Sequence, residues 1–347
     1  MERIFKLLTQ ISANLLFVLL VSTVVVLYWT AKPAIEEFGA YFIVDSRWAV
    51  DVKVPTESEG KAVGQTDSKP GVGHADKPVK NSEESDANLD DLDAGIDDDI
   101  SMDDDPTVAG LTSGEPKNTK TVYGGAVPIV GTIFATLIAM IFSIPLAMGI
   151  AVFLSEIASP IIAKPVGIAI ELLAAIPSII YGMWALFYFG PFIASIFGGH
   201  TVSLLVAGLV LGVMVIPFMA ALSRDAINTA PDVLKEAAYA VGATKFEVIK
   251  DIIFPYAKAG IIGSIIISLG RALGETMAVA FVIGGIFQYA TSITAPTNSI
   301  PVVLANNFAE SSGLSLSVLF YLALILFVVS FIIIFAAKHY FLRRGKI

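Results

Sequence analysis

Six long apolar runs constrain this chain more than any other feature of its sequence. A transmembrane helix needs about 20 mostly apolar residues. Runs of that length cover about residues 12–31, 124–153, 166–189, 202–222, 259–287 and 314–336. The hydrophobic share of 55% also exceeds what is usual in soluble domains. The sequence therefore predicts an all-α, polytopic membrane protein with six transmembrane helices.

Basic residues beside the runs indicate the orientation of the chain, because Lys and Arg mark cytoplasmic loops. They precede the first run, separate the second from the third and the fourth from the fifth, and follow the sixth: Arg3, Lys6, Lys164, Arg224, Lys235, Lys245, Lys250, Lys258, Lys338, Arg343, Arg344 and Lys346. The stretches 190–201 and 288–313 contain no Lys or Arg. We therefore expect both termini in the cytoplasm.

This orientation divides the chain into three parts. Residues 1–31 form the cytoplasmic N-terminus and the first transmembrane helix, 32–123 an outer loop, and 124–347 a core of five helices. The first run resembles a signal peptide in its preceding charges. Its apolar stretch is longer than a signal core, however, and no small-residue cleavage site follows promptly, so we interpret it as an anchor.

The negative charge of the chain is confined to the outer loop. Residues 45–115 hold 19 acidic and 6 basic residues, whereas the remainder holds 12 acidic and 16 basic residues. The tract 86–106 combines many like charges with few bulky apolar residues, which predicts a disordered, solvated tether. Weak cation binding and contact with a partner stay open, although the tract lacks the D-x-D-x-D-G run of a calcium loop.

Residues 229–255 are predicted to form two short helices between the fourth and fifth runs. Thr229 and Asp232 have capping-box spacing, as do Thr244 and Glu247, and Gly242 can end the first helix in a left-handed conformation. We expect Pro255 to end the second helix before the membrane. Small apolar residues share one face of the first helix, which favours docking into a protein groove over resting on lipid: Val233, Ala237, Ala240 and Val241.

Arg271 and Glu275 interrupt the fifth apolar run. Arg271 lies 13 residues beyond Lys258, which is about 20 Å along a helix and well inside a hydrocarbon core of about 30 Å. Spacing of four residues lets the two charges pair on one helix face. The pair could be structural, and Gly270 and Gly274 allow the close helix approach that this would need.

We favour a pathway role for the pair, because intramembrane charges mark substrate routes and guanidinium donors fit tetrahedral oxyanions. The hypothesis is that Glu275 shields Arg271 until an anion competes for it. Two weaker candidates are Glu171, near the inner end of the third run, and Thr276. Glu171 could instead cap a kink at Pro177 or bond across helices, and the hydroxyl of Thr276 could bond within its own helix.

The loop 229–255 also carries a family signature. Glu236-Ala237-Ala238-x3-Gly242-x9-Ile252-x-Phe254-Pro255 resembles the E-A-A-x3-G-x9-I-x-L-P motif of ABC-importer permeases and departs from it only at Phe254. In that family the loop docks into a cleft of the ATP-binding subunit and transmits its closure to the membrane helices. The resemblance therefore implies a coupling role for the matching positions Glu236, Ala237, Ala238 and Gly242.

Four further segments are similar to the phosphate-specific permeases of this family: 123–132, 167–187, 270–285 and 298–310. The likeness covers nearly all of residues 1–50 and 121–347. The likeness does not extend to residues 52–120, so the acidic tract looks like an insertion. The resemblance implies the type I permease fold and a bacterial inner-membrane location. It also implies a related permease subunit, two ATP-binding subunits and an external phosphate-binding protein as partners.

The chain itself carries no sign of catalysis or of a cofactor. It has no cysteine and no G-x4-G-K-[ST] run, and its three histidines form no cluster with carboxylates. We expect no catalytic residue, metal or nucleic-acid site here, so that ATP and magnesium belong to the partner ATPase. Three alternatives stay open: a permease for sulfate or molybdate, a secondary transporter, and a membrane component of phosphate signalling.

Overall fold

The computed structural model describes residues 2–53 and 119–343. The acidic tract 86–106 and its predicted role as a tether lie outside the described residues. The described residues divide into two units, residues 2–50 with 122–343, and residues 51–53 with 119–121. A two-stranded sheet that the sequence did not predict pairs β1 (Val50–Lys53) with β2 (Thr119–Val122).

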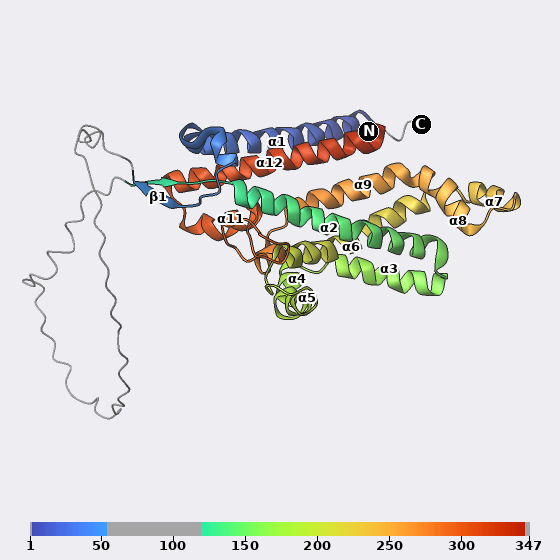
Figure 1. The fold of residues 1–347 in the computed structure, drawn as a ribbon. Coiled ribbons are helices and arrows are strands. Elements are labelled where there is room, and N and C mark those ends of the chain that lie inside the picture. Colours follow the sequence, from blue (N-terminus) through green and yellow to red (C-terminus); the bar gives the residue numbers. More distant parts are fainter. Residues whose placement is uncertain (1, 54–118, 344–347) are drawn as a thin grey trace, which may run out of the picture. The chain divides into compact units, whose positions relative to one another are not determined.

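Helices make up most of the larger unit (Figure 1). In chain order they are α1 (Glu2–Phe38), η1 (Gly39–Ile43), α2 (Ala126–Val152), η3 (Phe153–Ile157), α3 (Pro160–Ala174), α4 (Ser178–Trp184), η4 (Ala185–Phe189), α5 (Gly190–Phe197), α6 (Leu204–Asn228), α7 (Asp232–Ala240), α8 (Lys245–Glu247), η5 (Val248–Ile253), α9 (Phe254–Leu273), α10 (Met277–Ala280), α11 (Ile300–Asn307), η6 (Phe308–Glu310) and α12 (Gly313–Arg343).

Within the described residues, six helical segments are long and apolar enough to cross a membrane, as predicted. They are Phe5–Ile43, Ala126–Ile157, Ser178–Phe197, Leu204–Asn228, Lys245–Leu273 and Gly313–His339. The third and fifth differ from the predicted ranges. The run 166–189 is divided between α3 and α4 because Pro177, which lacks an N–H, stands between them as the N-cap of α4. The run 259–287 ends as a helix at Leu273.

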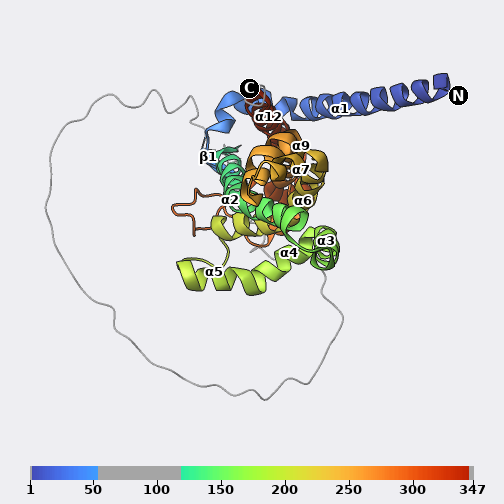
Figure 2. The same ribbon diagram turned by 90° about the vertical axis from the view of Figure 1, so that its right-hand side faces the viewer.

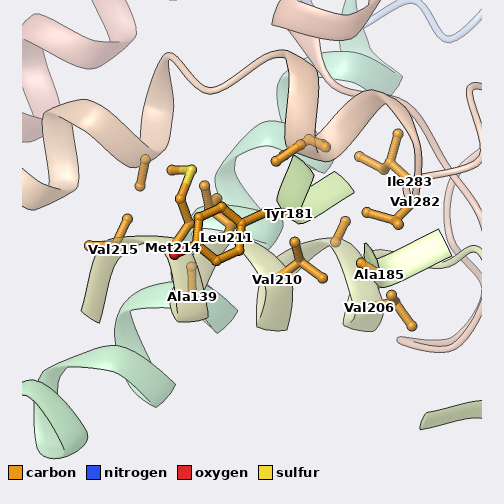
Figure 3. Packing of buried hydrophobic residues seen from close by; sticks show 14 of the residues in the cluster. Ala139, Tyr181, Ala185, Val206, Val210, Leu211, Met214, Val215, Val282 and Ile283 are labelled. Carbon is orange, nitrogen blue, oxygen red and sulfur yellow. The ribbon is translucent and has the colours of Figure 1, made fainter. Parts of the chain in front are cut away.

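The core forms around α6, which packs against α2, α3 and α9. Most side chains of α6 are buried, including Val206, Val210, Leu211 and Met214. Figure 3 shows these side chains meeting Tyr181 of α4 and Val282, which follows α10. Gly208 permits the close approach of α2, because a Cβ there would lie 2.7 Å from the Ile138 side chain.

A second apolar cluster joins α1 to α12. Ala31 and Ala34 near the end of α1 are fully buried, and they pack with Phe42, Leu319 and Leu322. The first half of α1 is exposed instead, and Figure 2 shows it leading away from the other helices. Its exposed apolar side chains suit contact with lipid or with another membrane subunit.

Candidate functional site

The loop between α6 and α9 forms the two short helices that the sequence predicts, but only one of its two caps. Thr244 Oγ1 accepts a hydrogen bond from the Glu247 N–H at 3.4 Å, and Glu247 Oε2 accepts from the Thr244 N–H at 2.7 Å, which completes the predicted capping box. The predicted Thr229–Asp232 box is wrong. Thr229 Oγ1 donates to the Ala226 carbonyl, and Pro231 is the N-cap of α7.

Gly242 ends α7 as predicted, in a left-handed conformation with φ +90°. Its N–H donates to the Tyr239 carbonyl at 3.0 Å, and the next N–H, from Ala243, donates to the Ala238 carbonyl at 3.0 Å. These two bonds satisfy carbonyls at the end of α7. The chain then reverses directly into the Thr244 cap, so that α7 and α8 form a compact pair.

Pro255 does not end the second helix, contrary to the prediction. The helical chain continues from α8 through the π-helical turn η5 into α9, and Pro255 stands in the first turn of α9. Proline in a helix clashes with the carbonyl four residues earlier. A wide π turn immediately before Pro255 relieves that clash. The consequence is one continuous helical path from the loop to Leu273.

The outer face of α7 is exposed and borders a groove of about 610 Å³. Of the predicted coupling residues, Ala237, Ala238 and Gly242 line this groove, together with Leu234, Val241, Ala243, Glu247, Val248, Asp251 and Ile252. Glu236 is exposed on α7 but does not line the groove. Val233 and Val241 are 72% and 86% exposed. The small-residue face is thus open to a partner.

The inner face of α7 carries a contact that the sequence did not predict. Lys235 Nζ lies 2.7 Å from Glu156 Oε1 in η3, and its side chain is only 17% exposed. Burial by itself lowers the pKa of Lys235, but the hydrogen bond and the attraction to Glu156 outweigh it, so the pKa is raised above its usual value. The two residues are 79 positions apart, and no local pattern joins them.

Arg271 and Glu275 do not form the predicted ion pair. Arg271 lies in the last turn of α9, with its guanidinium carbon 5.5 Å from the centre of the Phe218 ring of α6. Glu275 follows the end of α9, and its Oε1 accepts a hydrogen bond from the Ala278 N–H at 3.2 Å. The physical reason is that α9 ends at Leu273, so the four-residue spacing no longer places both side chains on one helix face.

The interruption between α9 and α10 includes Thr276, whose Oγ1 donates a long hydrogen bond of 3.4 Å to the Gly274 carbonyl. Arg271, Glu275 and Thr276 thus all lie at or beside the break between α9 and α10. Broken helices at membrane depth are tolerated where they are packed in protein or line a water-filled cavity. Phe218 was missed, since one Phe in an apolar helix gives no signal of a cation contact.

Glu171 belongs to a different group of charges. Its Oε1 lies 3.2 Å from Arg224 Nη2, and Arg224 stands within α6 and not in the following loop. A cavity of about 410 Å³ lies beside this ion pair, lined by Leu154, Ala163, Lys164, Ile168, Glu171, Arg224 and Asn228. Of the three open interpretations of Glu171, the structure supports a bond across helices.

Comparison with known proteins decides the family. The profile of the family described as "Binding-protein-dependent transport system inner membrane component" matches residues 124–346. The chain belongs to this family. It is therefore a multi-pass inner-membrane protein and a non-enzymatic subunit of a transport system.

Curated relatives match the same core. The chain is 44% identical over 244 residues to the "Phosphate transport system permease protein PstC" of Pasteurella multocida, covering 65% of this chain and 76% of that one. It is 41% identical over 254 residues to the protein of the same name in Mesorhizobium japonicum, covering 67% and 78%. The probable PstC of Methanocaldococcus jannaschii is 34% identical over 243 residues, covering 65% and 77%.

Solved structures resemble the fold alone. An inward-facing MetNI methionine ABC transporter matches with a TM-score of 0.52 at 20% identity, over 63% of this chain and 95% of that chain. A bacterial alginate ABC transporter in complex with its periplasmic protein matches with a TM-score of 0.50 at 16% identity, over 70% and 83%. Both support the ABC-importer permease fold that the sequence predicts.

Proposed function

We infer that this chain is the membrane-spanning permease subunit of an ATP-driven phosphate importer. The observation that carries this function is the 41–44% identity to phosphate permeases across the membrane core. The exposed small-residue face of α7 supports it, because that face fits the docking of a second protein. A secondary transporter is not favoured, since the family is that of binding-protein-dependent systems.

We propose a complex with a related permease subunit, two ATP-binding subunits and an external phosphate-binding protein. The binding protein delivers phosphate at the outer face, and ATP closes the two ATPases. Their closure moves the loop through Glu236, Ala237, Ala238 and Gly242, and the helices open outward. Hydrolysis and product release then reset the permease.

The proposed route for phosphate passes Arg271. The side chain is exposed at the broken end of α9, and within the described part of the chain its guanidinium makes no hydrogen bond. Its planar set of N–H donors suits a tetrahedral oxyanion. Glu275 and Thr276 flank the break, and Glu275 would keep the anion from being held too tightly, because conduction needs binding that is weak enough for release. Glu171, paired with Arg224, is proposed to border the inner end of the route.

Reconstitution tests this function. The chain is assembled with its partner subunits in proteoliposomes that contain ATP, and uptake of labelled phosphate is measured against sulfate and molybdate. We expect phosphate uptake that requires ATP, both ATP-binding subunits and the binding protein. Uptake of sulfate or molybdate in preference to phosphate would contradict the substrate, and uptake without the ATPase would contradict the class of transporter.

The proposed orientation has a direct test because the chain contains no cysteine. A single cysteine is introduced at Ser46, in the outer loop, or at Lys245, in the coupling loop, and whole cells are treated with a membrane-impermeant maleimide. We expect labelling at position 46 in intact cells, and labelling at position 245 only after the membrane is opened. The reverse pattern would contradict an outward loop and cytoplasmic termini.

A further inference from the structure

The contact between Lys235 and Glu156 joins two elements that the chain itself keeps apart. Lys235 belongs to α7, and Glu156 belongs to η3, which extends the transmembrane helix α2. Their N–O distance is 2.7 Å, and the side chains are 17% and 9% exposed. Such shielding makes the attraction stronger than that of an exposed pair, which typically contributes little to stability.

The rest of α7 is loosely attached to the membrane helices. None of its nine residues is buried, and Ala238 alone on this helix packs against the nearby apolar cluster. That cluster contains Ala151 of α2, Ile227 of α6, and Val248 and Ile253 of η5. Packing through Ala238 and the short connection to α8 therefore link α7 mainly to η5, which continues into α9. The ion pair supplies the specific link to the end of α2.

One face of α7 is open to a partner, and the other contacts the rest of the chain. Ala237 and Val241 are exposed and line the groove that is open to a partner. Lys235 faces Glu156, and Ala238, at the edge of the groove, packs against the apolar cluster; both are partly buried. A displacement applied to the outer face must reach the membrane through the inner face. A largely shielded ion pair resists separation, because parting the two side chains leaves each charge without its partner in a poorly hydrated place.

We propose that the Lys235–Glu156 pair is the positioning contact through which movement of α7 reaches α2. This inference rests on the proposed coupling role of the loop. Without the pair, movement of α7 is passed to α9 alone, and the helices fail to open together. ATP hydrolysis then continues while phosphate transport falls. Neither residue is assigned to the proposed phosphate route or to ATP binding, so both act by placing α2 relative to α7.

The test measures phosphate transported per ATP hydrolysed by the complete reconstituted complex. Lys235→Met removes the cation while keeping most of the apolar side chain, and we expect this ratio to fall about tenfold, within the range of typical coupling energies. Lys235→Arg keeps the charge and should retain the ratio. The charge exchange Lys235→Glu with Glu156→Lys should recover much of what either single reversal loses.

Asp232→Asn is the matched control. Asp232 also lies near Lys235, at 3.5 Å, but its side chain is 86% exposed, so its contribution is small. We expect the Asp232→Asn complex to transport as much phosphate per ATP hydrolysed as the unchanged complex does. A purely structural role would lower the yield of assembled complex without changing the ratio. The inference is overturned if assembled Lys235→Met keeps the unchanged ratio, or if Asp232→Asn loses it equally.

A crosslinked variant decides the matter if Lys235→Met fails to assemble. Lys235→Cys and Glu156→Cys are joined by a short thiol crosslinker that a reductant cleaves. Cleavage should reduce transport per ATP in the same sample, and an equal ratio before and after cleavage would contradict the inference. If the unchanged complex transports no phosphate, the proposed function fails, and this outcome is distinct from a failure of the variants alone.

Discussion

The guanidinium of Arg271 lies over the ring of Phe218, with its central carbon 5.5 Å from the ring centre, while the carboxylate of Glu275 accepts a hydrogen bond from the Ala278 N–H. The cation therefore contacts an aromatic face and not the carboxylate four residues away. A guanidinium that stacks on a ring keeps the N–H donors at its edge available. The hypothesis that Glu275 shields Arg271 thus does not describe this conformation.

We predict that Arg271→Gln lowers phosphate uptake by at least about tenfold, the loss expected when an ionic hydrogen bond of about 1.5–3 kcal/mol to the anion is removed. Arg271→Lys should be intermediate, because it keeps the charge but not the planar donors. ATPase stimulation by the binding protein should persist in both. Uptake at the unchanged level in an assembled Arg271→Gln complex would contradict the pathway role.

Phe218→Leu tests the aromatic contact separately. An exposed cation–π contact contributes about 0.5–1 kcal/mol, so we predict a change of only a few-fold in uptake. The affected quantity should be the concentration of loaded binding protein that gives half-maximal uptake, because the ring orients the guanidinium. A loss as large as that of Arg271→Gln would mean that Phe218 acts on more than the orientation of this side chain.

Two substitutions of Glu275 separate its charge from its hydrogen bond. Gln at this position keeps an oxygen that can accept from the Ala278 N–H and removes the charge, whereas Ala removes both. If the negative charge speeds release of phosphate, Glu275→Gln and Glu275→Ala should reduce turnover similarly. If the residue only holds the start of α10, Gln should behave like the unchanged chain and Ala should not. We predict the first pattern, read from the maximal rate of phosphate uptake.

Gly242 provides a test of the coupling loop. Its φ is +90°, and a Cβ placed there would meet no heavy atom within 4 Å, so the cost of substitution is in the backbone alone. We predict that Gly242→Ala disfavours the turn by about 1–2 kcal/mol and weakens binding of the ATP-binding subunit. Gly242→Asn should be milder, because Asn tolerates left-handed conformations. Equal affinities of both variants, measured with purified subunits, would contradict this.

Hydropathy was sufficient to predict the six spans, because burying apolar surface in lipid depends on composition and length. It did not predict where helices break. Arg271 and Glu275 are the only charged residues of the run 259–287, yet α9 ends at Leu273. Pro255, which the sequence indicates as a terminator, lies inside a continuous helical path because a π turn precedes it. Such choices depend on tertiary packing and not on local propensity.

The sequence also predicted only part of the site. Gly242 and the Thr244–Glu247 cap follow from local backbone chemistry, and both are confirmed. The pairing of Lys235 with Glu156, 79 positions away, follows only from the meeting of α7 and η3 in space. The four-residue spacing rule for charges on one helix predicted an ion pair between Arg271 and Glu275, which the structure does not contain. The same rule could not predict the ion pair between Lys235 and Glu156.

A third ion pair stabilises the junction between the outer loop and α2. Asp45 is buried, with its Oδ2 lying 2.6 Å from Arg47 Nη2, and its carbonyl accepts from the Ala126 N–H at 3.1 Å. The next side chain along, Trp48, stacks on Phe287 with ring centres 4.7 Å apart. Protonation of Asp45 can therefore be followed through the fluorescence of Trp48, which lies nearby.

We predict that this junction loosens in acid. The hydrogen bond from Arg47 holds the pKa of Asp45 below its usual value, outweighing the opposite effect of burial. A lowered folded-state pKa means that the stabilisation is present above the unfolded value of about 3.9 and is lost as the pH falls through the folded-state pKa. In a chain with Trp29→Phe and Trp184→Phe, the fluorescence of Trp48 should be constant from neutral pH down to about 4 and should change below it. The same chain with Asp45→Asn should lack this transition, since an amide does not titrate, and a transition of equal size in both chains would contradict the assignment to Asp45.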